Sequence, residues 1–201
     1  MFQTLCVFCG GSTRCDPSYL EIAKAVGQLL AKSNITLIYG GGNIGLMGAV
    51  ASGAMDNGGK VIGIIPEHLQ GTEKGHTGIT ELHVVKDMHE RKKKMFELSE
   101  GFITLPGGFG TLDEIFEILT WKQLALHTKP IVFLNHRGYW DKLHGMMEFM
   151  VEEKFIRDQH MEFFEVCSGV EDIFESLETS LHRKPLQFVG HTDIEIHPKK
   201  S

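Results

Sequence analysis

The chain has 201 residues, of which 42% are hydrophobic and 23% charged, and this composition fits one globular domain of ordinary size. Its formal net charge of −6 at pH 7 excludes a general electrostatic attraction to nucleic acid or to an anionic membrane. Its longest apolar runs, such as 61–65, are far too short to span a bilayer, and the first residues lack a basic leader, so we expect a cytoplasmic protein.

Short apolar or β-branched runs alternate with helical patterns along the chain. The expected strands are 4–8, 36–39, 61–65, 81–85, 102–105, 131–134 and 163–167. The expected helices are 18–32, 45–57, 88–99, 111–126, 139–154 and 170–181. Several strands are apolar throughout, as parallel strands covered on both faces are. The pattern predicts an α/β fold, a Rossmann-like, doubly wound, mostly parallel sheet with helices on both faces. We expect one domain over residues 1–181 and a loosely ordered tail over 182–201.

The cysteines do not form a metal-binding or redox pattern. Cys6 and Cys9 make a C-x-x-C motif, but residues three apart on a strand point to opposite faces of the sheet. The chain has no second C-x-x-C, only Cys15 and Cys167, and its histidines show no H-E-x-x-H pattern. We therefore expect four reduced thiols, mostly in the core, and no metal site.

Three glycine-rich turns follow predicted strands, at 10–12, 40–43 and 106–110. The carboxyl ends of parallel strands share one rim of the sheet, where doubly wound folds bind ligands near a topological switch point. Glycine lets backbone amides approach a ligand closely, and a helix that begins after such a turn offers its free N–H groups to an anion. These turns predict a nucleotide-sized cleft at this rim.

The second turn matches the dinucleotide-binding motif G-x-G-x-x-G at positions 40–45. That motif requires an acidic residue about 20 residues further on, at the end of the next strand, to hold a ribose. Here the next predicted strand is followed by a proline and then Glu67. The glycines also follow the second predicted strand and not the first, so the motif fits a dinucleotide-dependent oxidoreductase poorly. Such an enzyme is nevertheless one alternative. The other is a tight turn in which Gly45 and Gly48 allow close packing of the helix on the sheet.

The third turn leads into Thr111-Leu112-Asp113-Glu114, which has two interpretations. If Thr111 caps the helix, Glu114 completes a capping box and Asp113 favours the helix dipole. A capping box does not require glycines, however. If a phosphate takes the amides of 107–111, the Glu114 carboxylate is free to face another part of the ligand.

The apolar residues of this helix suggest where Glu114 points. Leu112, Ile115, Phe116 and Leu119 have the spacing of a core-facing stripe. Glu114 is about 200° around the helix from Leu112, so we expect it to point away from this core. The same face continues through apolar positions to 125, which predicts an exposed surface that a second copy of the chain covers.

The helix 88–99 supplies a cation on its inner face. Arg91 shares that face with Met88 and Met95, and Lys92 flanks it. An arginine on an apolar stripe needs an acceptor, because an unpaired buried charge is costly. The acceptor is either an internal carboxylate or a ligand phosphate or ribose, for which arginine offers planar, bidentate donors.

The segment P-G-G-F-G-T-L-D-E at 106–114 resembles the signature P-G-G-x-G-T-x-x-E of the Lonely Guy family. These are cytokinin riboside 5′-monophosphate phosphoribohydrolases, also labelled "possible lysine decarboxylase". The segments VFCGGS, YGGGNIGLMGAVA, GGKVIGIIPEHL, ELHVVKDMHERKKKM and TWKQLALHTKPIVFLN are similar to family segments and occur in the family's order. The resemblance covers about residues 5–167. The chain departs from the pattern in its first glycine turn and at 100–101.

The resemblance implies hydrolysis of the N-glycosidic bond of a cytokinin or adenine nucleoside 5′-monophosphate, which gives the free base and ribose 5-phosphate. It implies no cofactor and at least a homodimer. The catalytic residues it implies are Arg91 and Glu114. The substrate-binding residues it implies are Glu73, Lys92, Gly107, Gly108, Phe109, Gly110, Thr111, Asp113 and Thr120.

Lysine decarboxylation gains no support from the sequence, because the lysines lack the context that a pyridoxal phosphate enzyme needs. A non-catalytic nucleotide carrier on the same fold remains an alternative, since a fold does not fix a function. A carrier would share the glycine loops but would not need Glu114.

Overall fold

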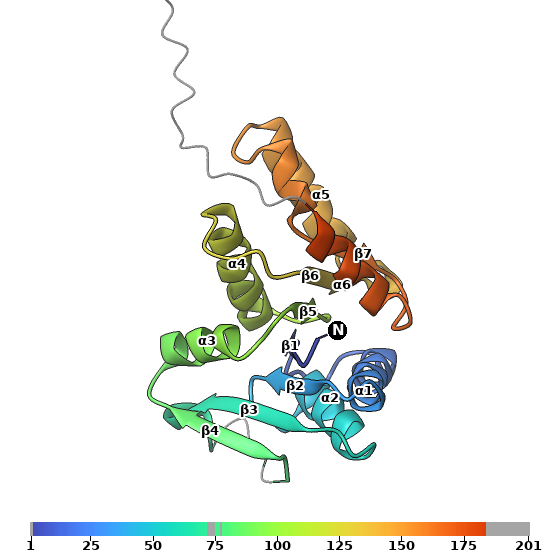
Figure 1. Ribbon diagram of the computed structural model, residues 1–201, viewed down its shortest axis with the longest axis vertical. Coiled ribbons are helices and arrows are strands. Elements are labelled where there is room, and N and C mark those ends of the chain that lie inside the picture. Colours follow the sequence, from blue (N-terminus) through green and yellow to red (C-terminus); the bar gives the residue numbers. More distant parts are fainter. Residues whose placement is uncertain (1, 72–74, 77, 184–201) are drawn as a thin grey trace, which may run out of the picture.

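A sheet of seven parallel strands forms the centre of the described part of the protein (Figure 1). The computed structural model describes residues 2–71, 75–76 and 78–183. The strand order is β4-β3-β2-β1-β5-β6-β7. The strands are β1 Thr4–Phe8, β2 Thr36–Tyr39, β3 Val61–Pro66, β4 Glu81–Val85, β5 Phe102–Thr104, β6 Ile131–Leu134 and β7 Glu165–Cys167.

Six α-helices of the described residues cover the two faces of the sheet. They are α1 Pro17–Lys32, α2 Gly45–Met55, α3 Met88–Glu97, α4 Phe109–Gln123, α5 Asp141–Glu152 and α6 Ile173–His182. Short 3-10 turns are η1 Glu67–Leu69, η2 His136–Gly138 and η3 Asp158–Phe163. Helices α1, α2 and α6 pack into one core, and α3, α4 and α5 pack into the other. The predicted doubly wound α/β fold is confirmed.

Alternate residues of strand β1 pack into the two cores on opposite faces of the sheet. Leu5 and Val7 belong to the core under α1, α2 and α6, while Cys6 and Phe8 belong to the core under α3, α4 and α5. This alternation follows from the period of a strand. It also separates Cys6 from Cys9, which joins the first core. All four cysteines are free thiols, so the C-x-x-C motif is a packing feature, as predicted.

The chain reverses its direction across the sheet between β1 and β5. From β1 it proceeds through α1 and α2 to β2, β3 and β4, and it then returns through α3 to β5 on the other side of β1. The loops that leave β1 and β5 meet, because the Gly10 N–H donates to the Pro106 carbonyl over 3.0 Å. This is the topological switch point at which doubly wound sheets bind ligands.

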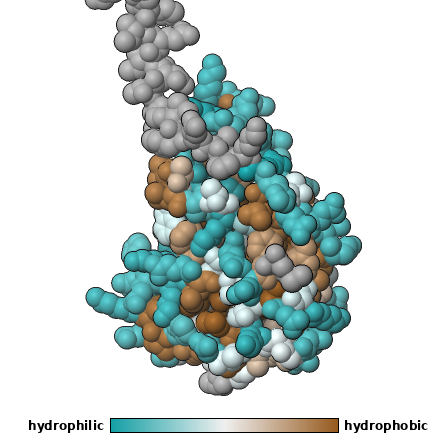
Figure 2. Space-filling model, in the orientation of Figure 1, coloured by the Kyte–Doolittle hydropathy of each residue, from teal (hydrophilic) through white to brown (hydrophobic). Residues whose placement is uncertain are grey.

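The apolar stripe that we predicted to be exposed on α4 is largely buried within the chain. Ile118 is 1% exposed, and the ring of Trp121 contacts Phe96 of α3 edge-on at 5.0 Å. The prediction failed because α3 covers this side of α4. Apolar side chains are instead exposed beyond it: Leu124 and Leu126 are 43% and 66% exposed, and Figure 2 shows a brown patch over the C-terminal end of α4.

The predicted tail over 182–201 falls almost entirely outside the described residues. The last described residue, Arg183, forms an ion pair with Glu165 of β7. Within the described ranges, none of the helices combines the length and apolar character that a membrane crossing would require.

Candidate active site

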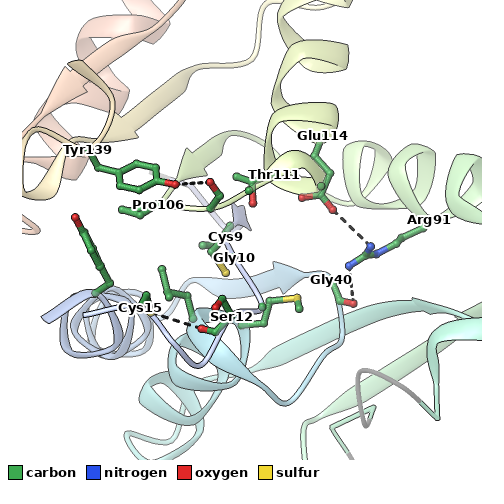
Figure 3. Close-up of a pocket in the computed structure, with 18 residues that line it drawn as sticks. Cys9, Gly10, Ser12, Cys15, Gly40, Arg91, Pro106, Thr111, Glu114 and Tyr139 are labelled. Carbon is green, nitrogen blue, oxygen red and sulfur yellow. Dashed lines mark hydrogen bonds and ion pairs between the residues drawn. The ribbon is translucent and has the colours of Figure 1, made fainter. Parts of the chain in front are cut away.

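A cavity of about 470 Å³ lies at the switch point, between the loops that follow β1, β2 and β5 (Figure 3). Its floor includes the first glycine turn and Gly40, and its walls include Leu46 and Met47 of α2. The start of α4 and Arg91 of α3 close a second side. Of the predicted site residues, those that line the cavity are Arg91, Gly107, Gly108, Gly110, Thr111 and Glu114.

Helix α4 begins two residues earlier than the sequence predicted. Its N-cap is Gly108, no side chain caps it, and its first residue is Phe109. Thr111 therefore lies within the first turn, and Glu114 lies beyond it. The capping-box interpretation is wrong. The first-turn N–H groups lack a capping side chain and carry the positive end of the helix dipole, which suits an anion.

The glycines after β5 are of two kinds: close packing requires Gly107, whereas Gly108 and Gly110 leave space for a ligand. A Cβ atom on Gly107 would lie 2.1 Å from Thr111 Oγ1 and 2.9 Å from the Gly10 nitrogen. Thr111 is 3% exposed, so its side chain fills the space beneath the loop. Gly108 and Gly110, in contrast, have open space where a Cβ would project. That open side is available to a bound group.

Glu114 lies on the buried face of α4. This differs from the prediction from the sequence, which had it pointing away from the core. The buried residues of the helix are Thr111, Glu114, Ile115, Ile118 and Leu119. Leu112 and Phe116, which we had assigned to the core stripe, are only partly buried. The core stripe is therefore rotated, and Glu114 takes one of its positions with 7% exposure.

Arg91 reaches the same cavity from α3 and is 5% exposed. Its Nε donates to the Ile64 carbonyl over 3.1 Å, and its Nη2 donates to the Gly40 carbonyl over 2.9 Å. Its Nη1 lies 3.7 Å from Glu114 Oε1 (Figure 3). The two carbonyls fix the plane of the guanidinium group, so that its remaining edge faces Glu114. The internal ion pair is present, and both members also face the cavity.

Glycine is needed beside this arginine and in the second glycine turn. A Cβ on Gly40 would lie 1.9 Å from Arg91 Nη2. Gly45 has φ of 59°, and a Cβ there would lie 2.4 Å from the Gly11 carbonyl carbon. A Cβ on Gly48 would lie 2.6 Å from the Asn43 carbonyl oxygen. These contacts support the interpretation of the G-x-G-x-x-G segment as a tightly packed turn.

Four other predicted binding residues within the described ranges do not line this cavity: Lys92, Phe109, Asp113 and Thr120. Lys92 Nζ is 3.1 Å from the Asp113 carboxylate and 3.4 Å from Glu117, so these residues join α3 to α4. Burial alone would lower the pKa of Lys92, but the two carboxylates outweigh it and raise that pKa. The Thr120 hydroxyl donates to the Phe116 carbonyl, and the Phe109 side chain is 93% exposed. Glu73 lies outside the described residues.

The sequence did not reveal several residues of the cavity wall. Tyr19 and Tyr139 line one side, and Cys9 and Cys15 lie near the first glycine turn. Burial and then the negative charge of Glu114 raise the pKa of Cys9, so its thiol stays protonated and acts as an apolar surface. Tyr139 follows β6, far from any motif in the sequence, and only the fold brings it to the site.

Comparison with known proteins gives consistent matches. The sequence family described as "Possible lysine decarboxylase" matches residues 47–177. The cytokinin riboside 5′-monophosphate phosphoribohydrolase of Rhodococcoides fascians is 42% identical, covering 88% of this chain and 90% of that protein. The enzyme LOG3 of Arabidopsis thaliana, which has the same name, is also 42% identical, covering 88% of this chain and 82% of its own length.

Solved structures of lower identity share the fold. The molybdenum cofactor carrier protein of Chlamydomonas reinhardtii aligns with a TM-score of 0.67 at 20% identity, covering 90% of this chain and 98% of that one. The molybdenum cofactor binding protein of Rippkaea orientalis aligns with a TM-score of 0.66 at 22% identity, covering 89% and 97%. At these identities the likeness concerns the fold alone, whereas the sequence matches show that the chain belongs to the cytokinin riboside 5′-monophosphate phosphoribohydrolase family, whose family description is "Possible lysine decarboxylase".

Proposed function

We propose that the protein hydrolyses the N-glycosidic bond of a nucleoside 5′-monophosphate with an adenine or N6-substituted adenine base, and that it releases the free base and ribose 5-phosphate. The observation that carries this proposal is a buried Arg91–Glu114 pair on the same cavity as a helix N-terminus without a capping side chain. The names of the relatives that share about 40% identity support the same reaction.

Two parts of the cavity, the start of α4 and the side chain of Glu114, match two parts of such a substrate, the 5′-phosphate and the ribose. The 5′-phosphate binds at residues 107–111, where the amides and the dipole of α4 attract an anion. Breaking the glycosidic bond builds positive charge on the ribose, as in the hydrolysis of O-glycosides. The Glu114 carboxylate stabilises this charge and orients a water molecule, whose oxygen joins C1′ as the C1′–N bond breaks. One proton of the water ends on the departing base.

Arg91 holds Glu114 in position and contributes donors to the ribose or phosphate. Two backbone carbonyls already orient its guanidinium group, so little reorganisation is needed when the substrate binds. Binding the phosphate far from the breaking bond holds the sugar in a reactive geometry. Phe109, Lys92, Asp113, Thr120 and Glu73 belong to the proposal only as substrate-binding candidates.

The cavity favours this reaction over decarboxylation and over a carrier role. A pyridoxal phosphate decarboxylase needs a lysine for its Schiff base, and the described lining of the cavity contains no lysine. A nucleotide carrier needs the glycine loop but gains nothing from a carboxylate close to an anionic ligand. The buried position of Glu114, beside Arg91 and on the cavity, supports chemistry on the sugar.

The direct test is incubation with AMP, with N6-isopentenyl-AMP and with adenosine, followed by chromatographic assay of the free base and of ribose 5-phosphate. We expect base release from at least one monophosphate and much slower release from adenosine, because the phosphate anchors the substrate. Tight binding of the monophosphates without release of base would support a carrier. Equal turnover of adenosine would contradict the phosphate anchor.

We also propose that residues 1–181 form a single domain, that the protein acts in the cytoplasm, and that it is a homodimer or a higher homo-oligomer. The oligomer is supported by the family resemblance and by the exposed apolar patch at the C-terminal end of α4 (Figure 2). Leu126→Glu places a charge in that patch and should shift the protein to monomer in sedimentation equilibrium. A wild-type monomer at tens of micromolar would contradict the proposal.

A further inference from the structure

Tyr139 connects the end of β6 to the glycine loop of the candidate active site. It follows η2 and lines the cavity, and its hydroxyl donates to the Gly107 carbonyl over 2.6 Å (Figure 3). The contact joins residues that lie 32 positions apart in the sequence. At this length it is a short, well-formed O–H···O hydrogen bond.

The peptide that Tyr139 contacts needs an external restraint. Gly107 and Gly108 precede the first turn of α4, and neither has a side chain that limits rotation of the backbone. On one side the Pro106 carbonyl is fixed by the Gly10 N–H, and on the other the Gly108 carbonyl accepts from Leu112 over 3.0 Å. The Gly107 carbonyl lies between these fixed points, and its partner is Tyr139.

Fixing that carbonyl also fixes a donor of the proposed phosphate site. A peptide unit is planar and trans, so the Gly107 C=O and the Gly108 N–H lie in one rigid plane and point in opposite directions. The Gly108 N–H is the first of the amides at 108–111 that precede or open α4. A rotation of this peptide would turn that N–H away from its place in the anion site.

Tyr139 is itself held from several sides. Its ring meets Trp140 edge-on at 4.8 Å and Tyr19 edge-on at 5.7 Å. Trp140 is 5% exposed, and its backbone N–H donates to Asn135 Oδ1 over 2.7 Å. In η2, Arg137 forms an ion pair with Asp16 over 2.7 Å, which ties this turn to the start of α1. The hydroxyl is therefore presented to Gly107 by an anchored structure.

We propose that Tyr139 is a positioning residue that orients the Gly107–Gly108 peptide, so that the affinity of the site for the 5′-phosphate depends on its hydroxyl. This inference rests on the proposed function, because it takes the glycine loop to be the phosphate site. It adds a requirement that lies outside the glycine-rich segment and that the sequence does not indicate.

The test compares Tyr139→Phe with Tyr39→Phe, since each variant removes one hydroxyl and keeps the ring. The Tyr39 hydroxyl does not line the cavity and has no hydrogen-bond partner among the described residues. Calorimetry with ribose 5-phosphate gives the dissociation constant, and steady-state kinetics with AMP separate KM from kcat. We expect Tyr139→Phe to raise both the dissociation constant and KM about three- to tenfold, the range of one hydrogen bond. We expect kcat to change less than KM, and Tyr39→Phe to resemble the wild type in both constants.

An unchanged dissociation constant in Tyr139→Phe would overturn the inference, and so would a loss confined to kcat. A circular-dichroism melt of each variant shows whether it is folded. Amide hydrogen exchange of the unliganded proteins gives a second measurement: the Gly108 amide should exchange faster in Tyr139→Phe than in Tyr39→Phe, and equal exchange would also overturn the inference. If the wild type neither hydrolyses AMP nor binds ribose 5-phosphate, the proposed function fails, while hydrogen exchange still decides whether Tyr139 orders the loop.

Discussion

Replacing Gly40 by alanine tests whether Arg91 is held where the chemistry needs it. The added Cβ would lie 1.9 Å from Arg91 Nη2 and 3.3 Å from Met47 Sδ. Gly40 is not among the described glycines with positive φ, so the backbone itself accepts alanine. The clash is therefore with side chains, and the guanidinium group must move.

The cost follows from what Arg91 loses when it moves. Its guanidinium group donates to two backbone carbonyls and faces Glu114, and it is 5% exposed. A hydrogen bond to a charged group contributes about 1.5–3 kcal/mol, so losing one or both lowers the free energy of unfolding by about 2–5 kcal/mol. For a domain of this size that is a fall in Tm of about 5–15 °C. Turnover of AMP should also fall, because the displaced Arg91 would no longer hold Glu114 in position.

Thermal unfolding and a double-mutant cycle measure this effect. Gly110→Ala is the matched control for stability, because Gly110 lines the same cavity and has open space where a Cβ would project. It should leave Tm unchanged or raise it slightly, since alanine favours a helix. In an Arg91→Ala background the cost of Gly40→Ala should fall below about 1 kcal/mol, because the clashing group is gone. The same cost in both backgrounds would refute the reasoning.

Two further predictions concern Glu114 and a half-buried histidine. Glu114→Gln keeps the size of the side chain but removes its charge, so AMP hydrolysis should fall by at least about a hundredfold. Calorimetry should still detect the binding of ribose 5-phosphate. Turnover at the wild-type rate would contradict the mechanism. Burial, assisted by the charges of Lys122 and Lys129, lowers the pKa of His127 from 6.5 to about 4, although its bond to the Ile118 carbonyl opposes this. Between these values the unfolded chain binds the proton more tightly, so stability should fall as pH drops from about 6.5 to 4. Urea unfolding should show this fall in the wild type and a smaller one in His127→Phe, and equal slopes in the two proteins would contradict it.

The fold was predictable because its signals are local. Strands such as β6, which is buried at every position, and helices with a clear period occur in strict alternation. Each predicted strand is present in the described residues, with boundaries that differ by at most a residue or two. The glycine turns also led to the correct rim, because carboxyl ends of parallel strands necessarily share it. These inferences require only the periods of helix and strand and the rules of topology.

The rotation of α4 and its first residue could not be obtained in this way. A glycine N-cap leaves no side-chain signature, so Thr111 was the more convincing cap in the sequence. The buried face of the helix depends on what packs against it, and α3 lies on the side that we had expected to be exposed. Tyr139 is a clearer case, since its partner Gly107 is close only after β5 and β6 have paired.

The error in placing Glu114 is informative about the site. Thr111, Glu114, Ile115, Ile118 and Leu119 have the spacing of a regular buried helix face, and an acidic residue is the one least expected at such a position. On the facing helix, Arg91 likewise takes a core position beside Met95. Burying such a pair costs desolvation energy that apolar side chains of similar volume would avoid, so it adds little or nothing to stability. Positions where charge replaces an expected apolar residue, and where that charge borders a cavity, are therefore better explained by chemistry than by folding.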